Sequence, residues 1–152
     1  MKKILLMLLT GLLLSAAACA QRGLNCYPVF KGKMVPERQM VVTEVRGGGL
    51  NTYTLDYYRG VRFQVDTTYA RKVAALVEAD AAQAASAETE RVRGFLTYAL
   101  IEPGSTGKTN RYLCYQARPV GSAWIITILY LEGSATLEDL RSMFDKQKDD
   151  EK

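Results

Sequence analysis

The sequence of 152 residues contains no histidine. Histidine is the usual base beside a serine or cysteine nucleophile, and it is the commonest metal ligand in proteins. Its absence excludes Ser-His-Asp and Cys-His catalysis and every metal site built on imidazole. The lack of these sites favours a non-catalytic binding or structural domain, and a hydrolase that uses carboxylates or a cysteine is kept as the alternative function. No cofactor is expected.

Long apolar runs are also lacking. The longest, residues 4–14, is shorter than the ~20 residues that a membrane-spanning helix needs. It follows a basic start at residues 1–3 and leads into small residues that end at Ala20. This order is typical of a secretory signal peptide. We therefore predict a signal peptide at residues 1–20 and an exported protein of the periplasm or cell envelope.

The signal peptide has two alternative ends. Residues 18–20, Ala-Cys-Ala, fit an A-x-A cleavage site that leaves Gln21 first and releases a soluble protein. Residues 16–19 are similar to a bacterial lipoprotein box, in which Cys19 would be lipidated and the protein held at the outer membrane. Such boxes usually carry a larger aliphatic residue in the place of Ala16, so soluble release is slightly favoured. A lipid on Cys19 is the only membrane attachment that we expect.

Charge of one sign is not concentrated anywhere. The chain has 20 basic and 16 acidic residues, with a formal charge of +4. The two signs alternate along the chain, whereas a nucleic-acid-binding protein more often shows a basic stripe. We therefore expect no nucleic-acid partner. An unknown envelope protein or a small ligand is the expected partner.

Five segments have the composition of strands. The most apolar is Trp124–Leu131, which contains no charge, glycine or proline. That composition predicts a central strand buried on both faces or nearly so. The glycines 47–49 predict a flexible turn after the first strand. The other predicted strands are Met40–Arg46, Leu50–Val65 with a bulge or bend at Gly60, Phe95–Ile101 and Asn110–Ala117.

Two segments have helical periodicity and helix caps. The first begins at Asp66–Thr67 and ends near Ala85. The second begins after Thr136, and Asp139 three residues later is close to a capping box. The charged segment Ser86–Arg93 is expected at the surface, with at most another helical turn.

This order of elements predicts one α+β domain over residues 40–146. We expect a mostly antiparallel five-stranded sheet with two helices packed on one face, in the order β-β-α-β-β-β-α. Residues 21–39 are expected to form an extended lead-in that packs Val29 and Phe30 on the domain. Residues 147–152 are expected to form a frayed charged tail.

Two cysteines, Cys26 and Cys114, remain after the predicted cleavage. An oxidising compartment permits a disulfide between them. The alternative is two separate cysteines, with Cys114 simply buried in its strand. The sequence leaves both interpretations open.

Seven of the nine tyrosines lie in predicted strands. If they were exposed on one face, Tyr53, Tyr57 and Tyr112 would offer a partner surface. The favoured interpretation is that β-propensity selects tyrosine and that these rings pack half-buried beneath the helices.

The segment Glu102–Thr109 is similar to the phosphate-binding loop G-x-x-x-x-G-K-T. It departs from that motif because Glu102 replaces the first glycine. The following Asn110–Tyr115 is also strand-like, where the motif needs the start of a helix. We therefore expect a hairpin loop with Lys108 in solvent. Acid–base chemistry would have to draw on scattered carboxylates, which solvated faces or helix caps explain better: Glu44, Asp56, Asp66, Glu78 and Asp80.

The segment Leu129–Leu140 joins a final apolar strand through Glu-Gly and a small residue to Thr-Leu and a short helix. Together with Asn-Arg-Tyr at Asn110, this resembles small exported domains of unknown function that are common in Bacteroidetes. The resemblance implies export and an α+β fold. It implies no catalytic residue.

Overall fold

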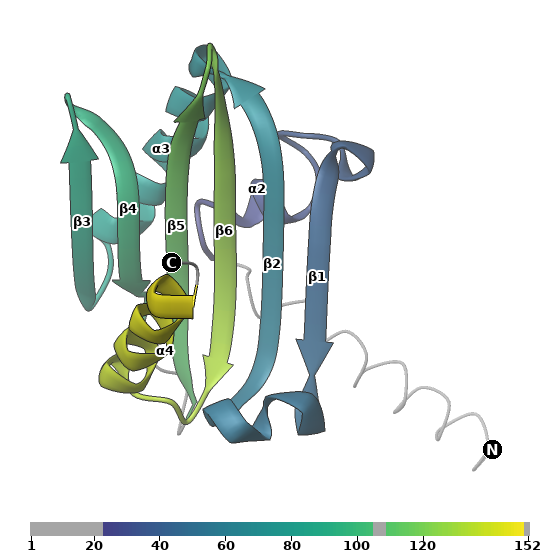
Figure 1. Cartoon of the computed structure of the whole chain (residues 1–152), viewed down its shortest axis with the longest axis vertical. Helices are drawn as coiled ribbons and strands as arrows, with labels where there is room; N and C mark the ends of the chain where they lie inside the picture. Colours follow the sequence, from purple (N-terminus) through teal and green to yellow (C-terminus); the bar gives the residue numbers. More distant parts are fainter. Residues whose placement is uncertain (1–22, 105–108, 151–152) are drawn as a thin grey trace.

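A computed structural model describes residues 23–104 and 109–150. The predicted signal peptide, Cys19 and Lys108 lie outside these residues. The described chain forms an antiparallel sheet of six strands in the order β1-β2-β6-β5-β4-β3, shown in Figure 1. The strands are β1 Met40–Arg46, β2 Leu55–Asp66, β3 Ser86–Val92, β4 Phe95–Glu102, β5 Asn110–Val120 and β6 Ala123–Gly133. The α+β class is confirmed, and the sheet has one strand more than predicted.

The predicted central strand, Trp124–Leu131, lies within β6, which pairs with β2 on one side and with β5 on the other. Its position is confirmed. Its apolar side chains from Ile126 to Leu131 alternate between two hydrophobic clusters on opposite faces of the sheet. Ile126, Ile128 and Tyr130 belong to one cluster. Leu129 and Leu131 belong to the other.

The helices lie on opposite faces of the sheet, so the prediction that both pack on one face is wrong. Val73 and Val77 of α3 (Thr67–Ala82) join the cluster around Ile126, and we call this side the α3 face. Leu140 of α4 (Leu137–Asp150) joins the cluster around Leu131, on the α4 face. Figure 1 shows α3 behind the sheet and α4 in front of it. The apolar stripe of a helix indicates that it packs on a sheet, but not on which face.

The strand β3 was missed because Ser86–Val92 is highly charged and does not alternate. It pairs only with β4 and forms one edge of the sheet. None of its residues is buried and six of the seven are exposed, so neither face packs on a core and its composition needs no apolar alternation.

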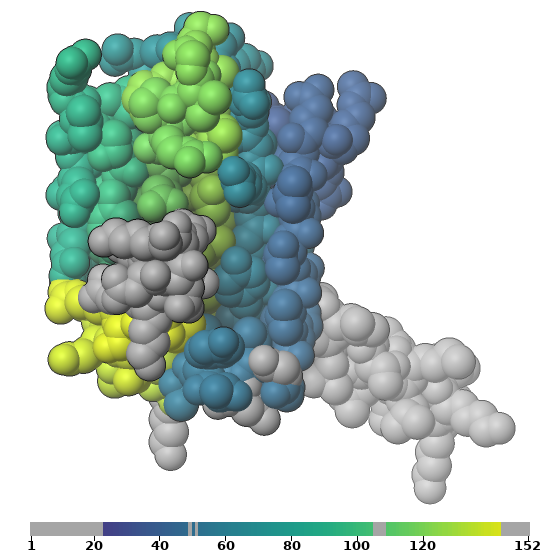
Figure 2. All heavy atoms as spheres, in the orientation of Figure 1, coloured from purple at the N-terminus to yellow at the C-terminus, as the bar shows by residue number. Residues whose placement is uncertain are grey.

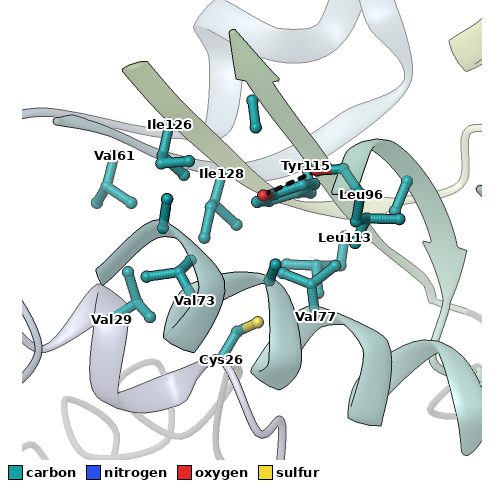
Figure 3. Packing of buried hydrophobic residues seen from close by; sticks show 14 of the residues in the cluster. Cys26, Val29, Val61, Val73, Val77, Leu96, Leu113, Tyr115, Ile126 and Ile128 are labelled. Carbon is teal, nitrogen blue, oxygen red and sulfur yellow. Dashed lines mark hydrogen bonds between the residues drawn. The ribbon is translucent and has the colours of Figure 1, made fainter. Parts of the chain in front are cut away.

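The lead-in is more structured than predicted. It contains α2 (Tyr27–Phe30) and a 3-10 helix, η1 (Glu37–Gln39). Val29 and Phe30 are fully buried in the α3-face cluster, so their predicted packing on the domain is confirmed. Figure 3 shows Val29 and Cys26 beside Val73 and Val77 of α3. The core therefore includes a segment that precedes the predicted domain.

The second strand begins later than predicted, because a 3-10 helix, η2 (Gly47–Tyr53), follows β1. The register of β2 shifts between Leu55 and Tyr57, and not at Gly60, where a bulge or bend was predicted. Gly60 has a different role: a Cβ there would lie 2.9 Å from the Tyr58 hydroxyl and 3.0 Å from Leu129. Glycine leaves the room that these two side chains occupy.

Candidate functional site

The two cysteines are free, buried thiols in separate clusters. Cys26 lies in the α3-face cluster and Cys114 in the α4-face cluster, so the sheet separates them and they form no disulfide. Burial raises the pKa of the Cys114 thiol to about 12. Burial, with the nearby Asp80 carboxylate, also raises the pKa of Cys26 far above its usual range. Because the thiolate is the nucleophile, neither cysteine is in a reactive form at neutral pH.

The five carboxylates singled out in the sequence lie in different environments. Asp66 caps α3, because its Oδ1 accepts a hydrogen bond from the Tyr69 amide at 2.8 Å. Glu78 pairs with Arg91 of β3. Asp56 is exposed beside the register shift in β2. No group of three cysteines and carboxylates within residues 23–104 and 109–150 is arranged to hold a metal ion.

Asp80 is the most buried carboxylate of the five, at 5% exposure. Its Oδ1 accepts hydrogen bonds from the Asn25 amide at 2.6 Å and from Asn25 Nδ2 at 3.1 Å. Its Oδ2 accepts one from the Cys26 amide at 3.0 Å. A buried charge is tolerated when hydrogen bonds replace its hydration. Asp80 therefore fastens the lead-in to α3, which is a structural role.

A shallow hollow of about 90 Å³ lies beside Asp80. It is lined by Gly23, Leu24, Asp80, Gln83, Pro103 and Arg111. Pockets for organic ligands usually enclose about 300–1,000 Å³. The hollow is thus too small to support a small-ligand site.

Glu44 is the centre of a polar network on the α3 face. Its Oε1 accepts hydrogen bonds from Arg46 at 2.7 Å and from the Tyr57 hydroxyl at 3.2 Å. Its Oε2 accepts one from Arg59 at 2.7 Å. Arg59 also donates to the carbonyl of Phe30 at 3.1 Å. The network joins β1, β2 and the lead-in, and the hydrogen bond from Arg46 is the main cause that lowers the pKa of Glu44.

The three tyrosines proposed for a partner surface do not share one. Tyr112 is 1% exposed, and its hydroxyl donates to the Ala135 carbonyl at 2.8 Å. Tyr57 is half-buried on the α3 face, edge-on to Tyr130. Tyr53 is exposed in η2. Tyr57 is therefore half-buried, as the favoured interpretation expects, and it does not share a partner surface with the other two tyrosines.

The loop that is similar to a phosphate-binding motif connects two strands. β4 ends at Glu102 and β5 begins at Asn110. The strand expected after the loop is thus confirmed, and the helix that a phosphate-binding loop needs is not there. Arg111 Nε donates to the Gly104 carbonyl at 3.2 Å, which fixes one end of the loop.

The β1 edge, defined as Met40–Arg46 with its unpaired outer side, is the surface that the sequence analysis missed. Among the described residues, β1 pairs only with β2. Val41 is 67% exposed and Val42 is 37% exposed. Figures 1 and 2 show β1 at the margin of the sheet and of the molecular surface. The run Met40-Val41-Val42 without alternation was the available signal, since it places apolar residues on both faces of one strand.

The opposite edge is protected. Glu88 and Arg91 of β3 form ion pairs with Arg141 and Glu78. The register of β3 also shifts between Glu90 and Arg91. β1 also carries ion-paired charges, but its register is regular, and an irregular register keeps an edge strand from pairing with another strand. The two edges of the sheet therefore differ in how open they are to an added strand.

The model of DUF6108, a family of unknown function, matches residues 13–144. The chain belongs to DUF6108. This agrees with the expectation of a domain of unknown function, and membership in DUF6108 assigns no catalytic residue. No curated protein and no solved structure matches the chain. In the part that the structure describes, no helix is long and apolar enough to cross a membrane.

Proposed function

We propose that this DUF6108 member is an exported cell-envelope protein whose domain binds another protein and catalyses no reaction. The observation that carries the proposal is the β1 edge, with Val41 and Val42 exposed on its two faces. An edge strand presents unpaired N–H and C=O groups to which an extended partner can add. Side chains on alternate faces then supply specificity.

The state of the reactive groups supports binding over hydrolysis. An envelope hydrolase would need a thiolate or a convergent carboxylate pair. Both thiols are buried with raised pKa values. Asp66, Asp80 and Glu44 are held by the helix cap, the lead-in and the arginines. Export rests on the pattern of residues 1–20.

Site-specific photo-crosslinking in the native envelope tests the proposal. A photoreactive residue at position 41 should give adducts with protein, because that position lies on the open edge. The matched control is position 92, since Val92 is 59% exposed on the protected edge. A Val42→Lys substitution should abolish the adduct at position 41 by placing a charge on the edge. Equal adducts at positions 41 and 92, or none at position 41, would contradict the proposal.

A further inference from the structure

We infer that the strand received by the β1 edge is β1 of a second copy of this chain. The two strands pair antiparallel about a two-fold axis at Thr43, which joins two six-stranded sheets into one. This inference rests on the proposed function, because it names the partner of the same edge.

The strand is a suitable template. It is seven residues long, and its side chains from Val41 to Glu44 are exposed or half-exposed. No proline or glycine interrupts it. Its pairing with β2 runs without a register shift over all seven residues, so its backbone is regular. Its unpaired side can therefore continue the ladder.

An axis at Thr43 pairs the whole strand with itself, because Thr43 is the middle residue of β1. Thr43 then lies opposite Thr43 of the second copy, and Val41 lies opposite Val45. These three residues share the α4 face, to which Val45 belongs. All three are β-branched, and β-branched pairs across two strands are favourable.

The same register is compatible with the side chains of β1 on the α3 face. Val42 lies opposite Glu44 of the second copy, and Met40 lies opposite Arg46. No like charges come directly opposite one another, which would be unfavourable. Each Glu44 is already neutralised within its own chain by Arg46 and Arg59. The register therefore brings no unpaired charge to the junction.

The pairing of the two copies is confined to Met40–Arg46, because β1 passes into a 3-10 helix at each end, η1 before Met40 and η2 after Arg46. No atom lies within 4 Å of a Cβ added at Gly47 or Gly48, so neither position is packed against another part of its own chain.

The contact is narrow and its affinity is modest. Seven residues extend over ~23 Å. A contact made by one strand of each copy buries less surface area than most specific protein interfaces, and small interfaces are typical of reversible association. Dimer formation should therefore depend on protein concentration. The protected β3 edge explains why pairing stops at two copies instead of extending into a fibre.

A cysteine scan of the mature chain beginning at Gln21 tests the register. Thr43→Cys should form a disulfide-linked dimer when diamide takes up the two electrons and two protons of the thiols. Opposed residues in an antiparallel pair have Cα atoms about 4.5 or 5.5 Å apart, and a disulfide spans either distance. Val41→Cys should not crosslink, because the two positions would lie ~13 Å apart. The buried Cys26 and Cys114 make the unsubstituted chain a suitable control.

Analytical sedimentation at graded protein concentrations tests whether the β1 edge forms the dimer contact. Val41→Lys and Val42→Lys should each raise the dimer dissociation constant about tenfold or more, because each change alters two symmetric contacts. Val92→Lys, a comparably exposed valine on the protected edge, should leave it unchanged. Circular dichroism would confirm that the variants are folded.

The outcomes separate the inference from the proposed function. A dimer that crosslinks at position 43 and dissociates in the β1 variants supports both. A second result is a monomeric chain that does not crosslink at position 43 but gives envelope adducts at position 41 with a different protein. This result overturns the inference that the partner is a second copy, and it supports the proposal that the β1 edge binds a protein. A dimer that is insensitive to Val41→Lys overturns the inference. The lack of both a dimer and envelope adducts overturns both.

Discussion

Asp80 is a charged residue inside the α3-face core, and it is kept there by three donors on Asn25 and Cys26. Two of these donors are backbone amides. Its sequence context, in an alanine-rich helix, suggested only a solvated carboxylate. The residue acquires its role because the lead-in returns to α3 from 54 and 55 positions away.

We expect Asp80→Asn to lower the free energy of unfolding by about 1–3 kcal/mol. An asparagine offers one acceptor oxygen, so its NH₂ group would face one of the backbone donors and leave it unsatisfied. Urea unfolding would measure the change. Asp56→Asn is the control, because Asp56 is exposed and its change should stay within about 0.5 kcal/mol. Equal losses of stability from Asp56→Asn and Asp80→Asn would contradict the role of Asp80 in fastening the lead-in to α3.

Gly133, at the end of β6, is required by a close backbone approach. A Cβ there would lie 2.5 Å from the Thr54 carbonyl oxygen and 2.6 Å from Leu55 Cα. Backbone cannot move aside as a flexible side chain can. We expect Gly133→Ala to lower the free energy of unfolding by about 1–3 kcal/mol or more. Gly48→Ala is the matched control, because nothing lies within 4 Å of its added Cβ. Thermal unfolding that is unchanged by Gly133→Ala would refute the close approach.

At the scale of elements, β1 is attached to the sheet by its ladder with β2 and by the Glu44 network. The folded state lowers the pKa of Glu44 below its ordinary value, first through the hydrogen bond from Arg46. A carboxyl with a lowered pKa stabilises the folded state above its unfolded pKa. That contribution is lost as the pH falls through the folded pKa.

We therefore expect the wild type to lose more stability than Glu44→Gln as the pH falls from about 6 to about 3. Above that range the difference between the two proteins should be constant. Urea midpoints across this range would measure it. If the urea midpoints of the two proteins fell in parallel with decreasing pH, the network would not favour the charged form of Glu44.

Hydrogen exchange should rank the strands by their position in the sheet. β6 is paired on both sides, and Ile126, Ile128 and Tyr130 are fully buried. Its amides should be among the slowest to exchange, as in a core strand. Amides on the unpaired sides of β1 and β3 should exchange faster. Exchange in β6 as fast as at Gly47–Gly49 would contradict its central role.

At the scale of the whole molecule, two clusters on opposite faces share one sheet, and the cysteines are divided between them. Each helix covers its own face, and the lead-in completes the α3 face. This arrangement leaves β1 and β3 as the two boundaries of the molecule along the sheet. The residues and register of these two edge strands therefore determine whether a second copy or another protein can add a strand to the sheet.

Processing is also a property of the whole chain. We expect the mature protein to lack residues 1–18 at least, because the signal peptide pattern ends between Ala18 and Ala20. Intact mass spectrometry of envelope and released fractions would identify the first residue. A mass beginning at Gln21 indicates soluble release, and one beginning at an acylated Cys19 indicates a lipoprotein. An intact Met1 would contradict both.

The sequence alone determined the elements whose signals are local. Asp66 and the Thr136–Asp139 capping box mark helix starts that the structure retains. The apolar run in β6 identified the central strand, because a strand that packs on both of its faces carries apolar residues at successive positions. A capping hydrogen bond or an apolar alternation is complete within a few residues, so sequence can specify it.

The arrangement of these elements around each other follows from tertiary contacts. The tertiary structure placed α4 on the opposite face from α3, recruited charged Ser86–Val92 as an edge, and separated Cys26 from Cys114. It also buried Tyr112 and left Val41 exposed, although both lie in strands. These outcomes depend on which neighbours a strand or helix meets from distant parts of the chain, and local patterns carry no record of those neighbours. The open β1 edge is such an outcome, because no seventh strand among the described residues pairs with it.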